Sequence, residues 1–174
     1  MKITAFAASN SSRSINLELV KNVASQFNKD QINLLDLNDF EMPIYSQDRN
    51  DKGIPEKATK FNEIMQQSDV IIISLAEHNG TFSTAFKNIF DWASRADMQV
   101  FKNKPMLLLS TSPGARAGMG VMQAAQSIFP YFGGNIKANF SLPSFHDNFK
   151  DGQIVNEQLK QQLESTLESF KQAL

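Results

Sequence analysis

The chain alternates short runs of hydrophobic residues with longer stretches in which hydrophobic residues recur every three or four positions. Short apolar runs indicate buried strands, and the three-to-four spacing indicates helices that bury one face. A regular alternation of the two is typical of a parallel sheet covered by helices on both faces. The pattern therefore predicts an α/β fold.

The apolar runs predict strands at residues 2–7, 31–37, 69–75, 106–109 and 135–140. Strand 69–75 (DVIIISL) is the most continuously apolar, so we expect it at the centre of the sheet. The helical spacing predicts helices at 15–28, 55–67, 82–95, 121–131 and 156–174. Between the second strand and the second helix, residues 38–54 form a long polar connection, and such long connections are often functional or mobile.

The length of 174 residues fits a single domain spanning 1–174. Five strands with right-handed crossover helices predict a flavodoxin-like three-layer sandwich whose five-stranded parallel sheet has the order 2-1-3-4-5. In that order the sheet reverses direction between strands one and three, and ligands bind beyond the carboxyl ends of the strands there. The loops expected to meet at this point are 8–16, 76–81 and 110–120.

Charge and composition narrow the function classes. Lys and Arg total 17 against 18 for Asp and Glu, so the net charge of -1 provides no attraction to nucleic acid or to anionic membranes. The absence of cysteine excludes disulfides, thiolate metal sites and cysteine nucleophiles, so any redox chemistry requires a bound cofactor. The N-terminal apolar run is too short for a signal peptide and no segment reaches membrane-spanning length. We expect a cytoplasmic protein without a nucleic-acid or membrane partner.

The first loop is rich in hydroxyl groups and contains one arginine. Residues 9–16 read S-N-S-S-R-S-I-N and lead into a predicted helix, whose N-terminal amides and dipole favour an anion such as a phosphate monoester. The alternative is that Ser12 or Ser14 simply caps the helix. The loop lacks both the Gly-Lys-Ser/Thr ending of a P-loop and the dinucleotide glycine pattern, which disfavours a nucleoside triphosphate or NAD here.

The second loop contains the pair Asn79-Gly80, which suits backbone conformations with positive φ. Such a turn either presents backbone groups to the pyrimidine edge of an isoalloxazine ring or simply joins a strand to a helix. His78 has no second histidine near it, since the other is His146, so we expect a surface or stacking residue and no metal site. If the loop binds a flavin, no catalytic side chain is needed, because the flavin carries the hydride chemistry itself, and none is assigned.

The third loop, residues 110–120, contains three glycines and has no bulky side chain before Arg116. A backbone without bulky side chains lets a flat ring approach closely. Arg116 is interpreted either as a solvated side chain or as a contact to an anionic ligand.

These segments together resemble one family. Residues 77–80 (E-H-N-G) and 86–92 (F-K-N-I-F-D-W) are similar to the P-E-Y-N-G and L-K-N-x-x-D-W signatures of NADPH-dependent FMN reductases. Residues 8–16 are similar to the family's G-S-x-R-x-x-S-x-N loop, and 110–120 to its S-x-S-P-G-x-x-G-G segment. Three departures from these signatures matter most: Ala76 replaces Pro, His78 replaces Tyr and Ser11 replaces Arg.

The resemblance implies which residues bind FMN. In the first loop, around the phosphate, they are Ser9, Ser11, Arg13, Ser14, Ile15 and Asn16; at the ring they are Glu77, His78, Asn79 and Gly80; in the third loop they are Ser110 and Gly114. Four further matches lie on a predicted helix, where capping, packing or dimer contacts are expected: Lys87, Asn88, Asp91 and Trp92.

The resemblance also implies an activity. The implied activity is that of an FMN-dependent NAD(P)H oxidoreductase. Such an enzyme transfers hydride, via noncovalent flavin, to a small acceptor such as a quinone, azo compound, chromate or free flavin. NAD(P)H is the expected cosubstrate and a homodimer or homotetramer the expected assembly. The alternative is a flavodoxin-like electron carrier or a flavin-free binding module. Carrier flavodoxins are strongly acidic, so the net charge of -1 favours the enzyme.

Overall fold

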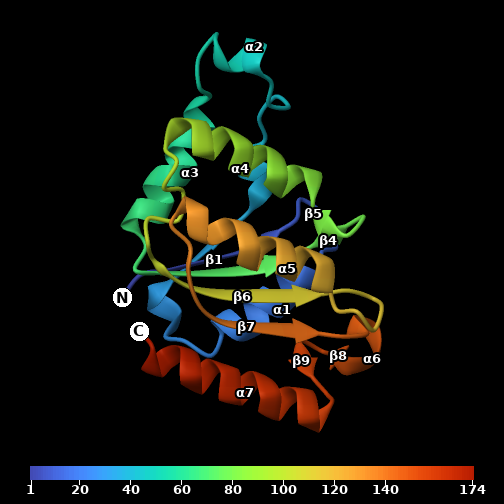
Figure 1. Cartoon of the computed structure of the whole chain (residues 1–174). Coiled ribbons are helices and arrows are strands. Elements are labelled where there is room, and N and C mark those ends of the chain that lie inside the picture. The colour runs from blue at the N-terminus through green and yellow to red at the C-terminus, as the bar shows by residue number, and fades with distance from the viewer.

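The protein, described over residues 1–174 by a computed structural model, is built on one five-stranded parallel sheet. From edge to edge the strands are β2 (Ile32–Leu35), β1 (Ile3–Ala8), β3 (Val70–Leu75), β6 (Pro105–Thr111) and β7 (Asn135–Leu142). Because β6 and β7 are the fourth and fifth strands of this sheet along the chain, the predicted order 2-1-3-4-5 is confirmed. The fold is therefore flavodoxin-like (Figure 1).

Helices cover both faces of the sheet and make three layers (Figure 1). One face packs against α1 (Ile15–Ala24) and α7 (Glu157–Gln172). The other packs against α3 (Glu56–Gln67), α4 (Thr84–Ala96) and α5 (Met119–Ile128). No helix is long and apolar enough to cross a membrane.

The central strands supply both cores, because successive side chains of a strand point to opposite faces. In β3, Ile71 and Ile73 belong to the cluster under α3, α4 and α5, while Ile72 belongs to the cluster under α1 and α7. All three are fully buried, and each such side chain stabilises the fold by roughly 1.5–3 kcal/mol. This rigid sheet fixes the positions of the loops at its carboxyl end.

Short elements complete the chain. They are the 3₁₀ turns Lys29–Gln31, Leu37–Phe40 and Phe129–Phe132, the short helices α2 (Gln47–Asn50) and α6 (Phe145–Asn148), and the hairpins β4 (Glu77–His78) with β5 (Thr81–Phe82) and β8 (Phe149–Lys150) with β9 (Gln153–Ile154). The connection 38–54 projects beyond the body of the domain, with α2 near its tip (Figure 1).

Several predicted boundaries are wrong by a few residues. The helix expected from residue 82 begins at Thr84, because the Ser83 hydroxyl caps it by accepting from Phe86 N at 3.2 Å. Phe82 lies in β5 instead, although it still packs into the core. The helix expected to end at 28 ends at Ala24. Residues 145–154, for which no element is predicted, form α6, β8 and β9.

Candidate functional site

The loops after β1, β3 and β6 follow neighbouring strands and leave the sheet at one edge, as the topology predicts. In the first of them, Ser9 Oγ accepts from Ser11 N at 3.2 Å and Ser11 Oγ accepts from Arg13 N at 3.3 Å. Ser14 is the N-cap of α1, since its hydroxyl accepts from Leu17 N at 3.2 Å. Its capping role, one of the two interpretations of this loop, is therefore real.

The same loop also presents hydrogen-bond donors that have no protein acceptor. The backbone amides of Ile15 and Asn16, in the first turn of α1, form no backbone hydrogen bond. The side chains of Ser12 and Arg13 are exposed and donate to no protein group. No carboxylate lies within residues 8–16. Helix N-terminal amides, a hydroxyl and a guanidinium are the donor set that suits a phosphate dianion.

Asn16 plays a different part from its neighbours. Its side chain is 3% exposed, and Oδ1 accepts from the Ser74 hydroxyl at 2.8 Å and from Thr111 N at 3.2 Å. Nδ2 donates to Thr111 O at 3.3 Å. The side chain is thus engaged by β3 and β6, and the group that Asn16 leaves open to a ligand is its backbone amide.

The second loop is a two-residue hairpin turn between β4 and β5. Both central residues have positive φ, 51° at Asn79 and 81° at Gly80, so the predicted backbone conformation is confirmed. A side chain on Gly80 would meet nothing within 4 Å, which leaves its backbone open to a flat group. The turn is tied to α5, because Glu77 Oε2 accepts from Val121 N at 2.9 Å. The carboxylate therefore caps a helix whose own N-cap, Gly118, has no side chain.

The third loop is held on its buried side by hydrogen bonds of the Ser110 hydroxyl. Ser110 is fully buried; its hydroxyl donates to Ala117 O at 2.7 Å and lies 2.8 Å from the Ser141 hydroxyl. Gly114 is exposed, and a Cβ there would meet nothing within 4 Å. Ser110 thus shapes the loop from inside. The Gly114 carbonyl accepts from Ala117 N, Ser144 N and the Ser112 hydroxyl, so only its amide is left for a ligand.

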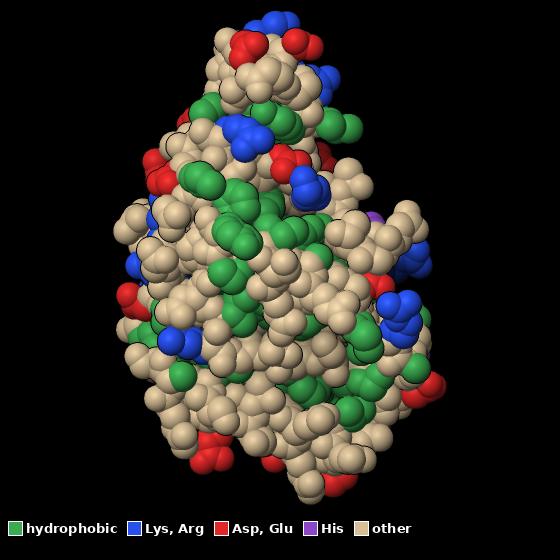
Figure 2. All heavy atoms as spheres, in the orientation of Figure 1, with side chains coloured by type: hydrophobic (Ala, Val, Ile, Leu, Met, Phe, Trp, Pro, Cys, Tyr) green, Lys and Arg blue, Asp and Glu red, His purple; other side chains and the backbone are tan.

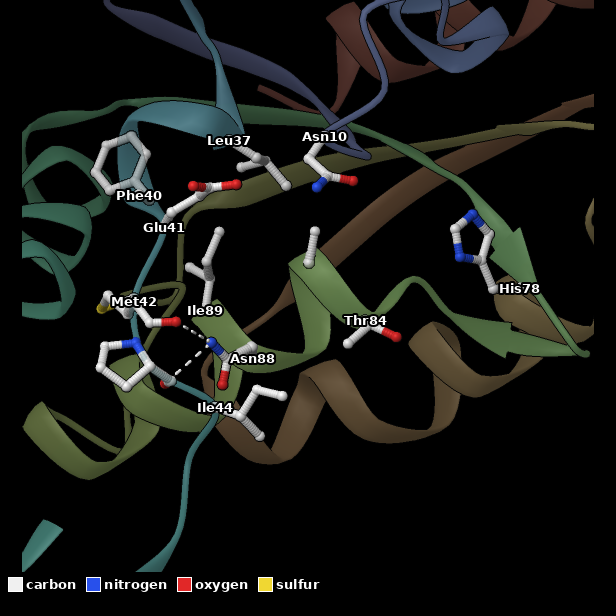
Figure 3. A pocket seen from close by; sticks show the side chains of 12 residues that line it. Asn10, Leu37, Phe40, Glu41, Met42, Ile44, His78, Thr84, Asn88 and Ile89 are labelled. Atoms are coloured by element: carbon white, nitrogen blue, oxygen red, sulfur yellow. Dashed lines mark hydrogen bonds between the residues drawn. The ribbon is translucent and has the colours of Figure 1, made fainter. Parts of the chain in front are cut away.

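A groove of about 610 Å³ opens beside the first two loops. We call it the main groove; its lining residues are Asn10, Leu37, Phe40, Glu41, Met42, Pro43, Ile44, His78, Thr84, Ala85, Asn88 and Ile89. Figure 3 shows Asn10 of the first loop and His78 of the β4 strand at one end and Met42 at the other. The groove therefore runs from the predicted cofactor loops to the connection after β2.

The predicted residues do not all face this groove. Only His78 lines it, whereas the first-loop serines line a second hollow of about 400 Å³ together with Lys21 and residues 34–38. The sequence analysis missed most of the main groove, above all its wall at 37–44. Asn88 offered a signal, since it belongs to the F-K-N-I-F-D-W match, but that segment was expected in capping, packing or dimer contacts. No group of three or more His, Asp or Glu side chains is arranged to hold a metal ion.

Comparisons with known proteins place this site in context. A family model described as NADPH-dependent FMN reductase matches residues 1–147. The chain is 28% identical over 146 residues to the uncharacterized protein MG342 homolog of Mycoplasma pneumoniae, covering 80% of this chain and 86% of that one. It is also 28% identical over 134 residues to a 2-hydroxy-1,4-benzoquinone reductase of a Burkholderia species, covering 74% and 72%. Alignments with two further relatives span less than half of those proteins.

A solved structure supports the fold. The flavoenzyme NAD(P)H:(acceptor) oxidoreductase FerB of Paracoccus denitrificans superposes with a TM-score of 0.75 at 20% identity, covering 97% of this chain and 94% of that one. The family match extends from β1 through the three loops and into α6, and so contains every element of the candidate site. The chain therefore belongs to the NADPH-dependent FMN reductase family.

Proposed function

We propose that this protein binds FMN, accepts reducing equivalents from NAD(P)H and passes them to a small acceptor in the main groove. The observation that carries the proposal is the donor set of the first loop. Two free helix amides, a free hydroxyl and an arginine stand next to a hairpin turn with an open backbone. The family match supports the same assignment.

The residues fit FMN in a specific way. The amides of Ile15 and Asn16 and the side chains of Ser12 and Arg13 would hold the phosphate. The Cα side of Gly80 would lie against the ring, because a Cβ there would meet nothing within 4 Å, whereas the Gly80 carbonyl lies against Gly120 of α5. When bound, FMN supplies the hydride-transfer chemistry.

The main groove would hold the acceptor, and its lining indicates which kind. Half of its lining residues are hydrophobic, and none is Lys or Arg. The only ordinarily charged side chain is that of Glu41, a carboxylate, which repels anions. We therefore infer that neutral, flat acceptors such as quinones or uncharged azo compounds are reduced faster than the chromate anion.

The direct test uses purified protein. We expect flavin absorbance or binding of added FMN, bleaching by NADPH or NADH without oxygen, and recovery of the absorbance when a neutral quinone is added. A colourless protein that binds no FMN would overturn the proposal and leave a flavin-free binding module. A yellow protein that no pyridine nucleotide reduces would indicate an electron carrier instead.

We also propose a homodimer or homotetramer in the cytoplasm. Support for self-association comes from the face formed by α4 and α5, over which hydrophobic side chains gather (Figure 2). Next to these helices Met98 is 62% exposed and Tyr131 is 74% exposed. Sedimentation equilibrium would test the assembly, and a monomer at micromolar concentration would contradict it. The cytoplasmic location remains a prediction from the sequence.

A further inference from the structure

One wall of the main groove is held by a single side chain of α4. Asn88 Oδ1 accepts from Tyr45 N at 2.8 Å. Its Nδ2 donates to Met42 O at 3.0 Å and to Pro43 O at 3.3 Å (Figure 3). Both polar atoms of the carboxamide are therefore used on the backbone of residues 42–45, which we call the wall segment.

A second side chain of α4 supports the same segment. Trp92 Nε1 donates to Pro43 O at 2.7 Å, and the Trp92 ring packs edge-on against Tyr45 with centroids 5.1 Å apart. On the other side of Tyr45, the Arg95 guanidinium carbon lies 5.0 Å from the ring centroid, and Nε donates to the Tyr45 hydroxyl at 3.0 Å. The wall segment is thus attached to α4 through both its backbone and a side chain.

The wall segment has few other contacts: Met42 packs against the core cluster under α3, α4 and α5, and the Arg49 side chain donates to Ile44 O. No backbone–backbone hydrogen bond involves residues 42–45, and the segment lies outside any helix or strand. Ile44 is 68% exposed, so its burial contributes little. Beyond it the chain continues into the projecting connection that carries α2 (Figure 1). Most of the hydrogen bonds to the backbone of the wall segment therefore come from α4.

We propose that Asn88 is a positioning residue that sets the width of the main groove by fixing the wall segment to α4. Asn88 does no chemistry, because its carboxamide is saturated by Met42, Pro43 and Tyr45. The inference rests on the proposed function, in which the groove holds the acceptor. It predicts that loosening the wall segment weakens acceptor binding and leaves FMN binding unchanged, since the FMN phosphate would be held by the first loop.

The test variant is Asn88→Asp. The carboxylate keeps the acceptor for Tyr45 N but places an oxygen against the carbonyls of Met42 and Pro43, where a donor is needed. We expect the KM for a neutral quinone to rise by about tenfold or more, the equivalent of one or two lost hydrogen bonds. The kcat and the Kd for FMN should stay within about threefold of the original values, a span smaller than a single hydrogen bond.

Trp92 gives a readout that does not depend on activity. It is the only tryptophan, it is 1% exposed, and it contacts the wall segment directly. In Asn88→Asp the fluorescence emission of Trp92 should shift to the red, and iodide should quench it. The matched control is Asp91→Asn on the same helix, whose partner Lys87 lies 2.7 Å away and which does not line the groove. The control should retain the KM and the emission of the unmodified protein.

The outcomes separate the two proposals. Unchanged KM and unchanged Trp92 emission in Asn88→Asp would overturn the inference, as would a rise in the FMN Kd equal to the rise in KM. If the unmodified protein neither binds FMN nor reduces the quinone, the proposed function fails. The Trp92 emission of Asn88→Asp still tests whether Asn88 holds the wall segment. Should Asn88→Asp not fold, Trp92→Phe removes the bond to Pro43 and puts a smaller ring against Tyr45, and we expect a KM rise of about threefold. No rise in that variant would likewise overturn the inference.

Discussion

The carboxamide of Asn16 pairs with both backbone groups of Thr111, donating to the carbonyl at 3.3 Å and accepting from the amide at 3.2 Å. The two residues lie 95 positions apart in the sequence. The same Oδ1 accepts from the Ser74 hydroxyl at 2.8 Å, so one buried side chain connects α1 with β3 and β6. The relative position of the three loops depends on this contact.

Asn16→Ala should therefore lower the free energy of unfolding by about 3 kcal/mol, because it leaves the Ser74 hydroxyl and both Thr111 backbone groups buried without partners. Urea denaturation followed by circular dichroism would measure the change. The control is Asn10→Ala, an exposed residue without such bonds, for which we expect a change within about 0.5 kcal/mol. If Asn16→Ala were as stable as that control, the Asn16 side chain would not be what holds α1, β3 and β6 together.

Local features of the site could be predicted from the sequence, and long-range ones could not. The positive φ of Asn79 and Gly80 is a local property, so the Asn-Gly pair indicated it correctly. The wall segment at 42–45 is bound by Asn88, more than 40 positions away, and no periodicity reports such a contact. For Asn16, spacing placed the residue at the start of α1 but did not show that its side chain turns inward towards Thr111.

A second prediction concerns Gly120, where α5 meets the β4–β5 turn. A Cβ at this position would lie 2.6 Å from Gly80 O and 2.9 Å from Glu77 Oε2, closer than van der Waals contact allows. Gly120→Ala must push the Asn79-Gly80 turn away from α5, at a cost of about 1–3 kcal/mol in the free energy of unfolding. FMN affinity should fall with it, because the turn would support the ring.

Fluorescence titration with FMN and a denaturation curve would measure both effects. Gly152→Ala is a useful reference, because it makes the same substitution in the turn between β8 and β9, where a Cβ would meet nothing within 4 Å. Its φ of +79° still strains an alanine, so only the loss of FMN affinity should distinguish the two variants. An unaltered FMN Kd in Gly120→Ala would argue against the turn as a support for the ring.

A third prediction tests the phosphate site. Arg13 is exposed and has no acidic partner, so Arg13→Gln should leave the fold intact and weaken FMN by about tenfold through the loss of a charged hydrogen bond. Riboflavin, which lacks the phosphate, should bind both proteins equally. Lys160→Gln on α7 makes the same change of net charge beside Asn22 and Ser25, at the opposite end of α1 from the first loop, and should affect neither ligand. Equal losses for FMN and riboflavin in Arg13→Gln would place the phosphate elsewhere.

A fourth prediction concerns acid stability, far from the groove. Hydrogen bonds from the Lys102 ammonium and, at 2.8 Å, from Gln99 N hold the pKa of Asp97 below its usual value of 3.8. A carboxyl group whose pKa is lower in the folded state stabilises the fold above the unfolded pKa and loses that contribution as the pH falls through the folded pKa. Because Asp97 is exposed to solvent, the contribution should be below about 1 kcal/mol.

Asp97→Asn should therefore be less stable than the unmodified protein at pH 7, and the difference should shrink as the pH falls below the ordinary aspartate pKa of 3.8 and the carboxylate takes up its proton. Urea midpoints at a series of pH values would show it. Asp30→Asn, also at an exposed site, removes the same charge without that partner pair and sets the baseline. The difference in stability between the two variants could instead stay constant down to the lowest pH. The Asn side chain would then disturb the turn at 97–102 by its shape, and the lowered pKa of Asp97 would contribute nothing to stability.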